Sequence, residues 1–310
     1  MANTLKSQGS ALGAIRPAQS GPGAMSIAVG ALRLLFIVGI IVFTLFPVLW
    51  IISAAINPAG SMSSQTFIPQ GVDSVDDMLV NVRALLEDPQ VPFWTWVLNS
   101  LVVSSITTLL TLAISALSAY SFSRFRFTGR RQLLVTILLI QVFPNLLAMV
   151  ALYLLLLQIG PYIPFLGLNQ HGGLILLYLG GAMGVNTWLM KGFFDTIPRD
   201  IDESAMVDGA THWQTFVQLI FPLVRPVMAV VAILAFVGTL NEFVLARIIL
   251  QDREKWTLMV GLFNFVEAEF SNDWGKFAAG ALMAATPVVI LYISLQKYIV
   301  GGLTQGAVKG

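Results

Sequence analysis

The most chemically distinctive residues of this sequence lie in one acidic segment, residues 202–222, which reads DESAMVDGATHWQTFVQLIFP. Three carboxylates, Asp202, Glu203 and Asp208, gather there, and no Lys or Arg follows until Arg225. Helices that lie on the anionic inner leaflet usually carry cations on their polar face, so lipid would repel this segment. The pattern therefore favours contact with a protein partner, and an amphipathic loop lying on the membrane surface is the alternative.

Helix signals divide this region into two short helices. Asp200 with Glu203 matches a capping box, and Gly209 suits a left-handed C-terminal cap. Thr211 with Gln214 matches a second capping box, which begins a helix that runs on to the proline at 222. Apolar residues recur at spacings of four and three and predict one stripe, made of Met206, Ala210, Trp213, Val217 and Ile220. A helix pair with such a stripe needs a surface to press against.

A second candidate is an acidic residue inside an apolar stretch. Glu242, beside Asn241, is predicted to lie within a membrane span, where a carboxylate is a functional candidate by default. Arg247 lies near the external end of the same stretch and is its expected ion-pair partner. Structural pairing and the lining of a transport pathway are both consistent with this position.

Several kinds of chemistry lack the residues they would need. The chain has no cysteine, and its histidines, His171 and His212, lack the spacing of metal ligands. No G-x-x-x-x-G-K-[ST] phosphate loop occurs, since Gly275-Lys276 is followed by Phe277. A formal net charge of +1 argues against a nucleic-acid partner. We therefore expect no metal site, no ATP binding by this chain and no enzymatic activity.

The elements that must position these residues are membrane helices. Of the 310 residues, 56% are hydrophobic and only 11% are charged, and residues 132–190 contain no Lys, Arg, Asp or Glu. A bilayer core takes about 20 apolar residues per helix, so that window alone predicts two spans. We predict an all-α integral membrane protein with six transmembrane helices, at 34–56, 95–122, 133–157, 173–191, 225–248 and 277–299. Pro144, Pro226 and Pro287 are expected to kink or cap spans.

The distribution of cations orients the chain. With the N-terminus inside, the cytoplasmic segments carry twelve Lys and Arg residues and the external segments carry five, so both termini and the acidic segment are predicted to be cytoplasmic. Residues 1–33 are interpreted as a flexible cytoplasmic tail, 34–300 as the transmembrane domain, and 301–310 as a C-terminal tail too flexible to fold alone. Within the domain, 195–222 forms a cytoplasmic loop and 250–276 an external loop.

The acidic segment also carries a family motif. Glu203-Ser204-Ala205, three residues, Gly209, nine residues, Leu219, one residue and Phe221-Pro222 closely resemble the EAA loop of bacterial ABC importer permeases. That loop reads E-A-A, x3, G, x9, I, x, L, P. Ser204, Leu219 and Phe221 depart from it by small or volume-tolerant changes.

The resemblance extends over most of the chain. Residues 98–130, 143–153, 162–181 and 302–310 are similar to the G-type permeases of maltose/maltodextrin importers, whereas the first 30 residues and the first external loop resemble them least. The sequence thus resembles the inner-membrane permease subunits of binding-protein-dependent ABC sugar importers in bacteria.

This resemblance implies a type I ABC importer permease with an EAA coupling helix. The implied ATPase-coupling residues are Glu203, Ser204, Ala205, Met206, Asp208, Gly209, Ala210 and Pro222. Glu203 would contact a cation on the ATPase, while Met206 and Ala210 would fill its apolar cleft. The implied partners are a second, different permease, a homodimeric ATPase, a periplasmic sugar-binding protein and membrane lipid. ATP and magnesium would be bound by the ATPase, so this chain would itself need no cofactor.

Two further contacts are implied by the resemblance. The external segment 266–275 would reach into the binding protein and help to release its sugar, through Glu267, Glu269, Asn272 and Trp274. Carboxylates, amides and aromatic rings are the groups that hold carbohydrates, although an ordinary solvated loop is the alternative. The C-terminal tail would insert between the two ATPase subunits, through Thr304, Gln305 and Gly306. Asn241 and Glu242 would lie at the permease interface or line the pathway.

The expected function is the import of maltose, maltodextrin or a related glucoside, such as trehalose, from the binding protein into the cytoplasm. One alternative is an ABC permease for another oligosaccharide or a polyol. An ion-coupled secondary transporter and a membrane-anchored regulatory module are alternatives from other classes.

Overall fold

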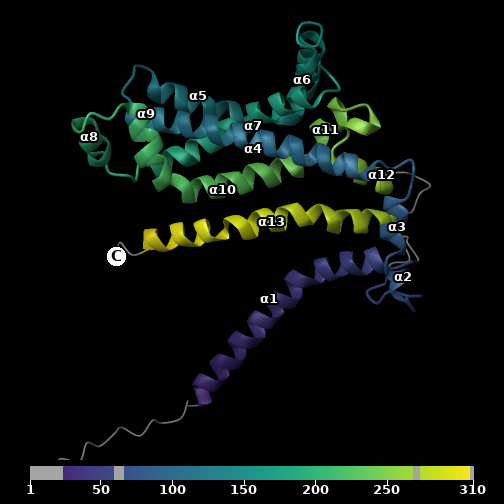
Figure 1. Ribbon diagram of the computed structural model, residues 1–310. Helices are drawn as coiled ribbons and strands as arrows, with labels where there is room; N and C mark the ends of the chain where they lie inside the picture. The colour runs from purple at the N-terminus through teal and green to yellow at the C-terminus, as the bar shows by residue number, and fades with distance from the viewer. Residues whose placement is uncertain (1–23, 59–65, 268–272, 308–310) are drawn as a thin grey trace, which may run out of the picture. The chain divides into compact units, whose positions relative to one another are not determined.

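The computed structural model describes residues 24–58, 66–267 and 273–307, and the regular structure within these ranges is helical throughout (Figure 1). The predicted all-α class is therefore confirmed. Over the described residues, the chain divides after Trp50 into two compact units. The first unit contains most of α1 (Ala24–Ile56), an apolar helix of 33 residues.

Helices long and apolar enough to cross a membrane match most of the predicted spans. Besides α1, they are α4 (Phe93–Arg124), α7 (His171–Phe194), α10 (Phe221–Leu240) and α13 (Trp274–Ala307). The connecting elements are α2 (Val75–Met78), α3 (Val80–Leu86), η1 (Pro164–Leu166), α11 (Val244–Ile249), η3 (Arg253–Lys255) and α12 (Leu258–Glu267). With one bent pair of helices counted as a span, the described residues supply up to six spans.

The third predicted span is that bent pair and not one continuous helix. Residues Arg130–Val142 form α5 and Asn145–Ile159 form α6, and the chain bends by 103° between them. The break falls at Phe143, which has an extended backbone (φ −66°, ψ 127°), and at Pro144, the N-cap of α6. A residue before proline is driven out of the helical region, and proline has no N–H to donate. The prediction of a single helix over 133–157 is therefore wrong, and Pro144 caps the helix that follows the break.

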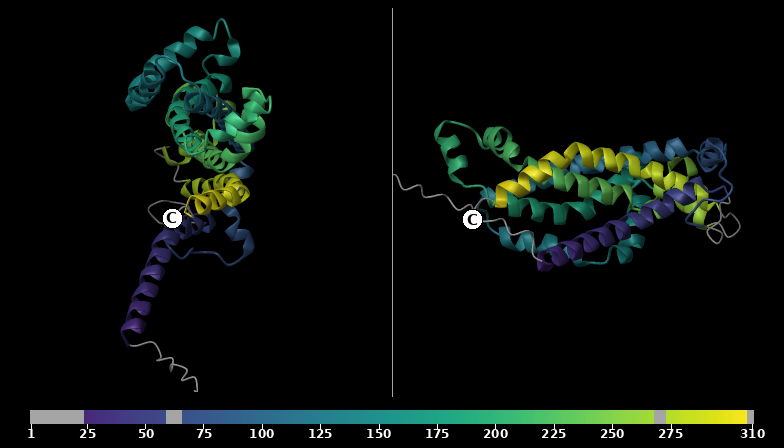
Figure 2. Two further views of the ribbon diagram at one scale, coloured as in Figure 1. Left: turned by 90° about the vertical axis from the view of Figure 1, so that its left-hand side faces the viewer. Right: turned by 90° about the horizontal axis from the view of Figure 1, so that it is seen from below.

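Within the second unit, α4 is the central helix. It packs along α7 and α10, and α10 also packs against α13 (Figures 1 and 2). The buried face of α4 is rich in small hydroxyl side chains, among them Ser104, Thr111 and Ser115. Small residues let membrane helices approach closely, so van der Waals contact between backbones stabilises these seams.

Larger side chains fill the core at both ends of this bundle. At the end that carries α3 and α12, Trp96 meets Gly261 so closely that a β-carbon at 261 would lie 2.1 Å from the indole ring. At the opposite end, Tyr120, Phe194 and Phe216 belong to a second buried cluster. This second cluster supports the acidic segment.

The last helix continues further than predicted. α13 runs through Ala307, although residues 301–310 are predicted to form a tail with no fold of its own. Extending an existing helix adds one hydrogen bond for each residue fixed and avoids the cost of nucleation, so the glycines do not end it. The side chains of 301–307 lie outside the described part of the chain, and so do the predicted contacts of Thr304, Gln305 and Gly306.

Candidate functional site

The acidic segment folds as a helix–turn–helix at one end of the bundle, where Figure 1 labels α8 and α9. It comprises α8 (Asp200–Val207), α9 (His212–Gln214) and the π-helical turn η2 (Thr215–Ile220), which leads directly into α10. Any displacement of this segment therefore acts on the membrane helix that follows it without an intervening loop.

The turn after α8 is set by a glycine. Gly209 has φ +86°, which confirms the predicted left-handed cap. The N–H of Gly209 donates to the carbonyl of Met206 (3.1 Å), and the N–H of Ala210 donates to the carbonyl of Ala205 (2.9 Å). These two bonds form a Schellman motif and satisfy carbonyls that the helix end would otherwise leave unpaired.

Of the two predicted capping boxes, one is present. The Oγ1 of Thr211 accepts from the N–H of Gln214 (3.2 Å), and the Oε1 of Gln214 accepts from the N–H of Thr211 (2.8 Å). The box predicted for Asp200 and Glu203 is wrong, because the N-cap is Arg199, whose backbone is itself helical (φ −69°, ψ −22°). Both carboxylates instead lie in the first turn of α8, where their negative charge interacts favourably with the positive end of the helix dipole.

α8 presents two different faces. Asp202 and Ala205 point into the protein and are 4% and 7% exposed. Glu203 is exposed on the other side, and Met206 and Val207 are 41% and 88% exposed. Ala205, which is predicted to be a coupling residue, therefore lies on the inward face, whereas Glu203 and Met206 lie on the accessible one.

The predicted apolar stripe is divided in the same way. Trp213 and Val217 are exposed, Ala210 is half-buried, and Ile220 is completely buried in the core beneath α10. Ser204, Asp208 and Gly209 are exposed with Glu203, and Pro222 is half-buried at the start of α10. The accessible surface therefore combines carboxylates with large apolar side chains.

Asp202 is not the surface acid that the sequence suggests. Its Oδ2 lies 2.9 Å from the Nε of Arg124, at the end of α4, and both side chains are less than 10% exposed. The Nη1 of Arg124 donates to the carbonyl of Phe194 (3.2 Å), and its Nη2 donates to that of Ile197 (3.1 Å). Removing one partner of such a buried pair leaves a charge without compensation, at a cost of about 3–5 kcal/mol.

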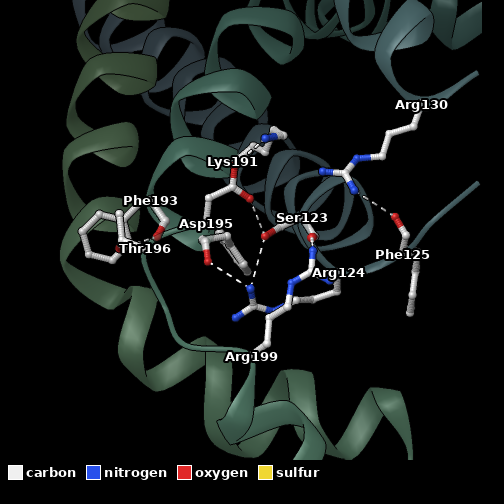
Figure 3. Close-up of polar contacts among 10 residues, drawn as sticks. Ser123, Arg124, Phe125, Arg130, Lys191, Phe193, Asp195, Thr196 and Arg199 are labelled. Atoms are coloured by element: carbon white, nitrogen blue, oxygen red, sulfur yellow. Dashed lines mark hydrogen bonds and ion pairs between the residues drawn. The ribbon is translucent and has the colours of Figure 1, made fainter.

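A second polar cluster adjoins this pair (Figure 3). The hydroxyl of Ser123 donates to the Oδ1 of Asp195 (2.7 Å), and the ammonium of Lys191 pairs with the other oxygen. Arg199, just before α8, donates to the carbonyl of Ser123 (3.0 Å). Burial raises the pKa of Asp195, but the hydrogen bonds from Lys191 and Ser123 outweigh it, so this pKa lies below its usual value. The cluster ties the end of α7 and the start of α8 to the end of α4.

The second candidate, Glu242, lies in a break between two helices. α10 ends at Leu240, and α11 begins at Val244, so the continuous span predicted for 225–248 is wrong. The reason is local: the carboxylate of Glu242 accepts from the N–H groups of Leu245 (2.8 Å) and Ala246 (3.1 Å) and thereby caps the start of α11. Asn241, its neighbour, is exposed at the C-cap of α10.

The other partner of Glu242 comes from α7. The hydroxyl of Tyr178, which is 8% exposed, donates to the Oε2 of Glu242 at 2.6 Å. Both residues border a cavity of about 980 Å³ between α5, α6, α7 and α11. The predicted pairing of Glu242 with Arg247 is wrong, because Arg247 faces Glu267 (3.5 Å) and lies over the ring of Trp256.

The external residues predicted to touch sugar are placed only in part. Glu267 ends α12, where it faces Arg247, and Glu269 and Asn272 lie outside the described residues. Trp274 begins α13, stacks on Phe277 (centroids 5.2 Å apart) and packs against the core, so it is not a free aromatic platform in the loop. Over residues 24–58, 66–267 and 273–307, no three His, Asp or Glu side chains gather closely enough to hold a metal ion.

Arg124 and Tyr178, which hold the two acidic residues in place, are not predicted from the sequence. Arg124 is visible there only as one of several arginines after the second span. Neither residue is near its partner in the chain, so no local spacing indicates the pairing.

Comparisons with known proteins agree with this architecture. A family model described as "Binding-protein-dependent transport system inner membrane component" matches residues 111–304, which include the acidic segment. A chain of a bacterial ABC transporter involved in the import of the acidic polysaccharide alginate has the same fold. The TM-score is 0.69 at 23% identity, and the match covers 89% of this chain and 98% of that one.

Two relatives are similar over most of their length. The maltose/maltodextrin transport system permease protein MalG of Vibrio vulnificus (strain YJ016) is 40% identical over 272 residues, or 86% of this chain and 91% of that protein. The galactooligosaccharides transport system permease protein GanQ of Bacillus subtilis (strain 168) is 41% identical over 271 residues, or 87% of this chain and 92% of that protein. The chain therefore belongs to the family of inner-membrane components of binding-protein-dependent transport systems.

Proposed function

We propose that this chain is one of two membrane-spanning subunits of an ATP-driven importer that moves maltose, maltodextrin or a related glucoside into the cytoplasm. Family membership makes it a multi-pass permease subunit of the bacterial inner membrane, not an enzyme. The substrate is supported by similarity to permeases of maltose/maltodextrin systems, at 40% identity in Vibrio vulnificus and 38% in Escherichia coli strain K12. The cation distribution predicts that both termini and α8 lie in the cytoplasm.

The two-faced helix α8 is the observation that carries the coupling part of the proposal. Its inward face is fixed by a buried ion pair, so its outward face is presented as a rigid surface. That surface sets the carboxylate of Glu203 beside the apolar side chains of Met206 and Val207. It would fit a cleft on a separate ATPase subunit in which apolar walls surround a cation.

Transport then follows from a difference in contacts between two states. ATP and magnesium bind to the partner ATPase, whose two copies close on each other and displace α8. Because the segment 200–220 continues directly into α10, this displacement reaches the membrane helices. A second permease subunit completes the pathway, and a periplasmic binding protein delivers the sugar to the external side. The ATPase drives the cycle only to the extent that it binds the two states of the permease with different affinity.

The coupling proposal is tested in proteoliposomes that hold the full complex, with wild type beside Glu203→Lys. Charge reversal keeps the helix but places like charges at the contact, and we expect the Kd for the ATPase to rise at least about tenfold, or ~1.4 kcal/mol. ATP-dependent uptake should fall with it. Glu87→Lys reverses an exposed acid at the end of α3 and should leave ATPase binding unchanged. Unchanged binding and uptake in Glu203→Lys would show that α8 is not the docking site.

Galactooligosaccharides are a second candidate substrate class, because the galactooligosaccharide permease GanQ is as similar to this chain as the maltose permeases are. The same proteoliposomes, assayed with maltose, maltodextrin, trehalose and a galactooligosaccharide, separate the two. Uptake of the galactooligosaccharide alone would replace the glucoside assignment and leave the coupling proposal intact. Uptake that survives loss of the ATPase and collapses with an ion gradient would indicate a secondary transporter instead.

A further inference from the structure

The inward face of α8 is attached to the membrane helices at Asp202, whose carboxylate faces the guanidinium of Arg124 and the hydroxyl of Tyr120, both on α4. Arg124 contributes all of its terminal nitrogens to this attachment: Nε faces Asp202 of α8 at 2.9 Å, and Nη1 and Nη2 donate to the carbonyls of Phe194 and Ile197. Arg124 itself belongs to the last turn of α4. A single side chain therefore joins α8, the end of α7 and the end of α4.

The other attachments of α8 are weaker in kind. Ala205 offers only a methyl group to the core, and Ile201 packs against it while partly buried. Arg199 donates to the carbonyl of Ser123 (3.0 Å), but it precedes the helix and is exposed as a residue. Small apolar contacts allow sliding, whereas buried charges that separate lose their mutual attraction without regaining hydration. The Arg124–Asp202 pair is thus the contact that most resists displacement of α8 against the bundle.

The two membrane helices that Arg124 joins to α8, namely α4 and α7, are packed so that they can move together. α4 and α7 pack along one another more extensively than any other pair of elements, and their ends meet in the cluster of Figure 3 around Ser123 and Asp195. A force on Asp202 acts on both helices, because Arg124 belongs to α4 and donates to the carbonyl of Phe194, the last residue of α7, and to that of Ile197 just after it. The planar fork of arginine permits this three-way contact, and the single ammonium of lysine does not reproduce it.

We propose that the Arg124–Asp202 ion pair is the positioning contact that makes α8 move as one body with α4 and α7. The inference rests on the proposed function, in which an ATPase pulls on the outward face of α8, and it adds the residues that pass the pull inward. Both side chains are buried within this chain, so the proposed role requires no contact with the ATPase or the transported solute. Asp202 and Glu203 thus have separate tasks on opposite faces of the same turn.

The chain contains no cysteine, so two labelling sites can be introduced without removing any native thiol. Val207 on α8 and Leu109 on α4 are 88% and 66% exposed and suit spin labels as a Val207→Cys, Leu109→Cys pair. Leu109 is 15 residues before Arg124, or about 22 Å along the helix, which places the labels within the range of pulsed electron spin resonance. Distances are measured in the assembled complex without nucleotide and after trapping with ATP and vanadate.

In the wild-type background, the distance between the two labels should be narrow and the same in both states. In Asp202→Asn, which is isosteric but uncharged, trapping should shift or broaden it by about 5 Å, the rise of one helical turn. Arg124→Lys should behave in the same way, and it supplies the test if Asp202→Asn does not assemble. Asp200→Asn, an exposed acid of the same turn, should match the wild type.

ATPase binding, measured on the same samples, separates the docking proposal from the positioning proposal. If the ATPase does not bind the wild-type chain, or if it binds Glu203→Lys equally well, the proposed docking site fails. The positioning role is overturned by a different result, in which the ATPase binds Asp202→Asn as tightly as the wild type. In that result, the label distances in Asp202→Asn and Arg124→Lys also stay as in the wild type on trapping. A wild-type distance that itself changes on trapping would overturn it as well.

Discussion

The contact between Tyr178 and Glu242 offers a quantitative test of how the break in the fifth span is stabilised. The Tyr178 hydroxyl donates to a carboxylate at 2.6 Å, and the same carboxylate accepts two N–H groups at the start of α11. Tyr178→Phe removes one hydrogen bond to a charged acceptor and leaves the ring packed. Glu242→Ala removes all three bonds at once.

The expected magnitudes follow from these partners. A hydrogen bond to a charged group contributes about 1.5–3 kcal/mol, so Tyr178→Phe should destabilise the folded chain by that amount. At roughly 2–4 °C per kcal/mol, a loss of about 2 kcal/mol lowers the melting temperature by about 4–8 °C. Glu242→Ala should cost more, since the two N–H groups of α11 also lose their acceptor.

A double-mutant cycle in detergent-solubilised protein measures the contact itself. Because the hydrogen bond is already absent in Glu242→Ala, adding Tyr178→Phe should cause little further loss, and the coupling free energy should be about 1.5–3 kcal/mol. Tyr292→Phe, at an exposed tyrosine of α13, is the control and should melt with the wild type. Strict additivity of the two substitutions would refute the contact as described.

Two further predictions concern packing and pH. Gly261→Ala would place a methyl group 2.1 Å from the Trp96 ring and should destabilise the chain by about 1–3 kcal/mol or more. Gly238→Ala in α10, where an added methyl group would meet nothing within 4 Å, should stabilise the chain by about 0.5–1 kcal/mol. The melting temperatures of the two variants check this, and equal shifts would contradict it. Asp195 has a lowered pKa, so its stabilising contribution is present above the unfolded-state value of about 3.9 and is lost as the pH falls through the folded-state pKa. Asp195→Asn should therefore melt below the wild type at pH 7, and the difference should shrink as the pH falls below about 4 and vanish below the lowered folded-state pKa of Asp195. A difference that persists there would show that the lost charge is not its cause.

The parts of the fold that could be predicted from the sequence are those that local rules control. Hydrophobic length gives the spans, because the bilayer thickness is a fixed requirement. Gly209 and the Thr211–Gln214 box are predictable for the same reason: left-handed backbone and reciprocal capping are each decided within four residues. The EAA motif contains both of these local signals, which is why the accessible segment around Glu203 could be located from its residues alone.

The breaks in the third and fifth spans could not be predicted in this way, because they scarcely change the hydropathy of the sequence. Phe143 and Pro144 lie in an uncharged run, and only the effect of proline on the residue before it ends α5. At Glu242, the carboxylate starts a new helix by accepting N–H groups of Leu245 and Ala246. A span assignment treats this carboxylate as a polar residue within a helix, whereas its hydrogen bonds make it the point at which the helix restarts.

Asp202 could not be placed from the sequence because its role depends on a residue in another helix. An isolated acid beside Glu203 is predicted to be a second surface charge, and only the position of Arg124 at the end of α4 makes burial tolerable. The periodicity does contain a weak signal, since Ile201 and Ala205 are four residues apart and bracket Asp202 on one side of α8. That spacing indicates an inward face but gives no indication of which cation meets the carboxylate there.

The arrangement of α8 also bears on the alternative of a loop that lies on the membrane surface. Such a helix needs one apolar face for the acyl chains and a cationic face for the headgroups. In α8 the face turned to the protein holds Asp202, and the accessible face holds Glu203 together with Met206 and Val207, so lipid contact would bring a carboxylate toward an anionic surface. A protein cleft with a cation on its wall and an apolar floor would have no such conflict, since the cation would pair with Glu203 and the floor would cover the two side chains. The distribution of charge over the two faces therefore favours a protein partner more strongly than the composition of the segment does.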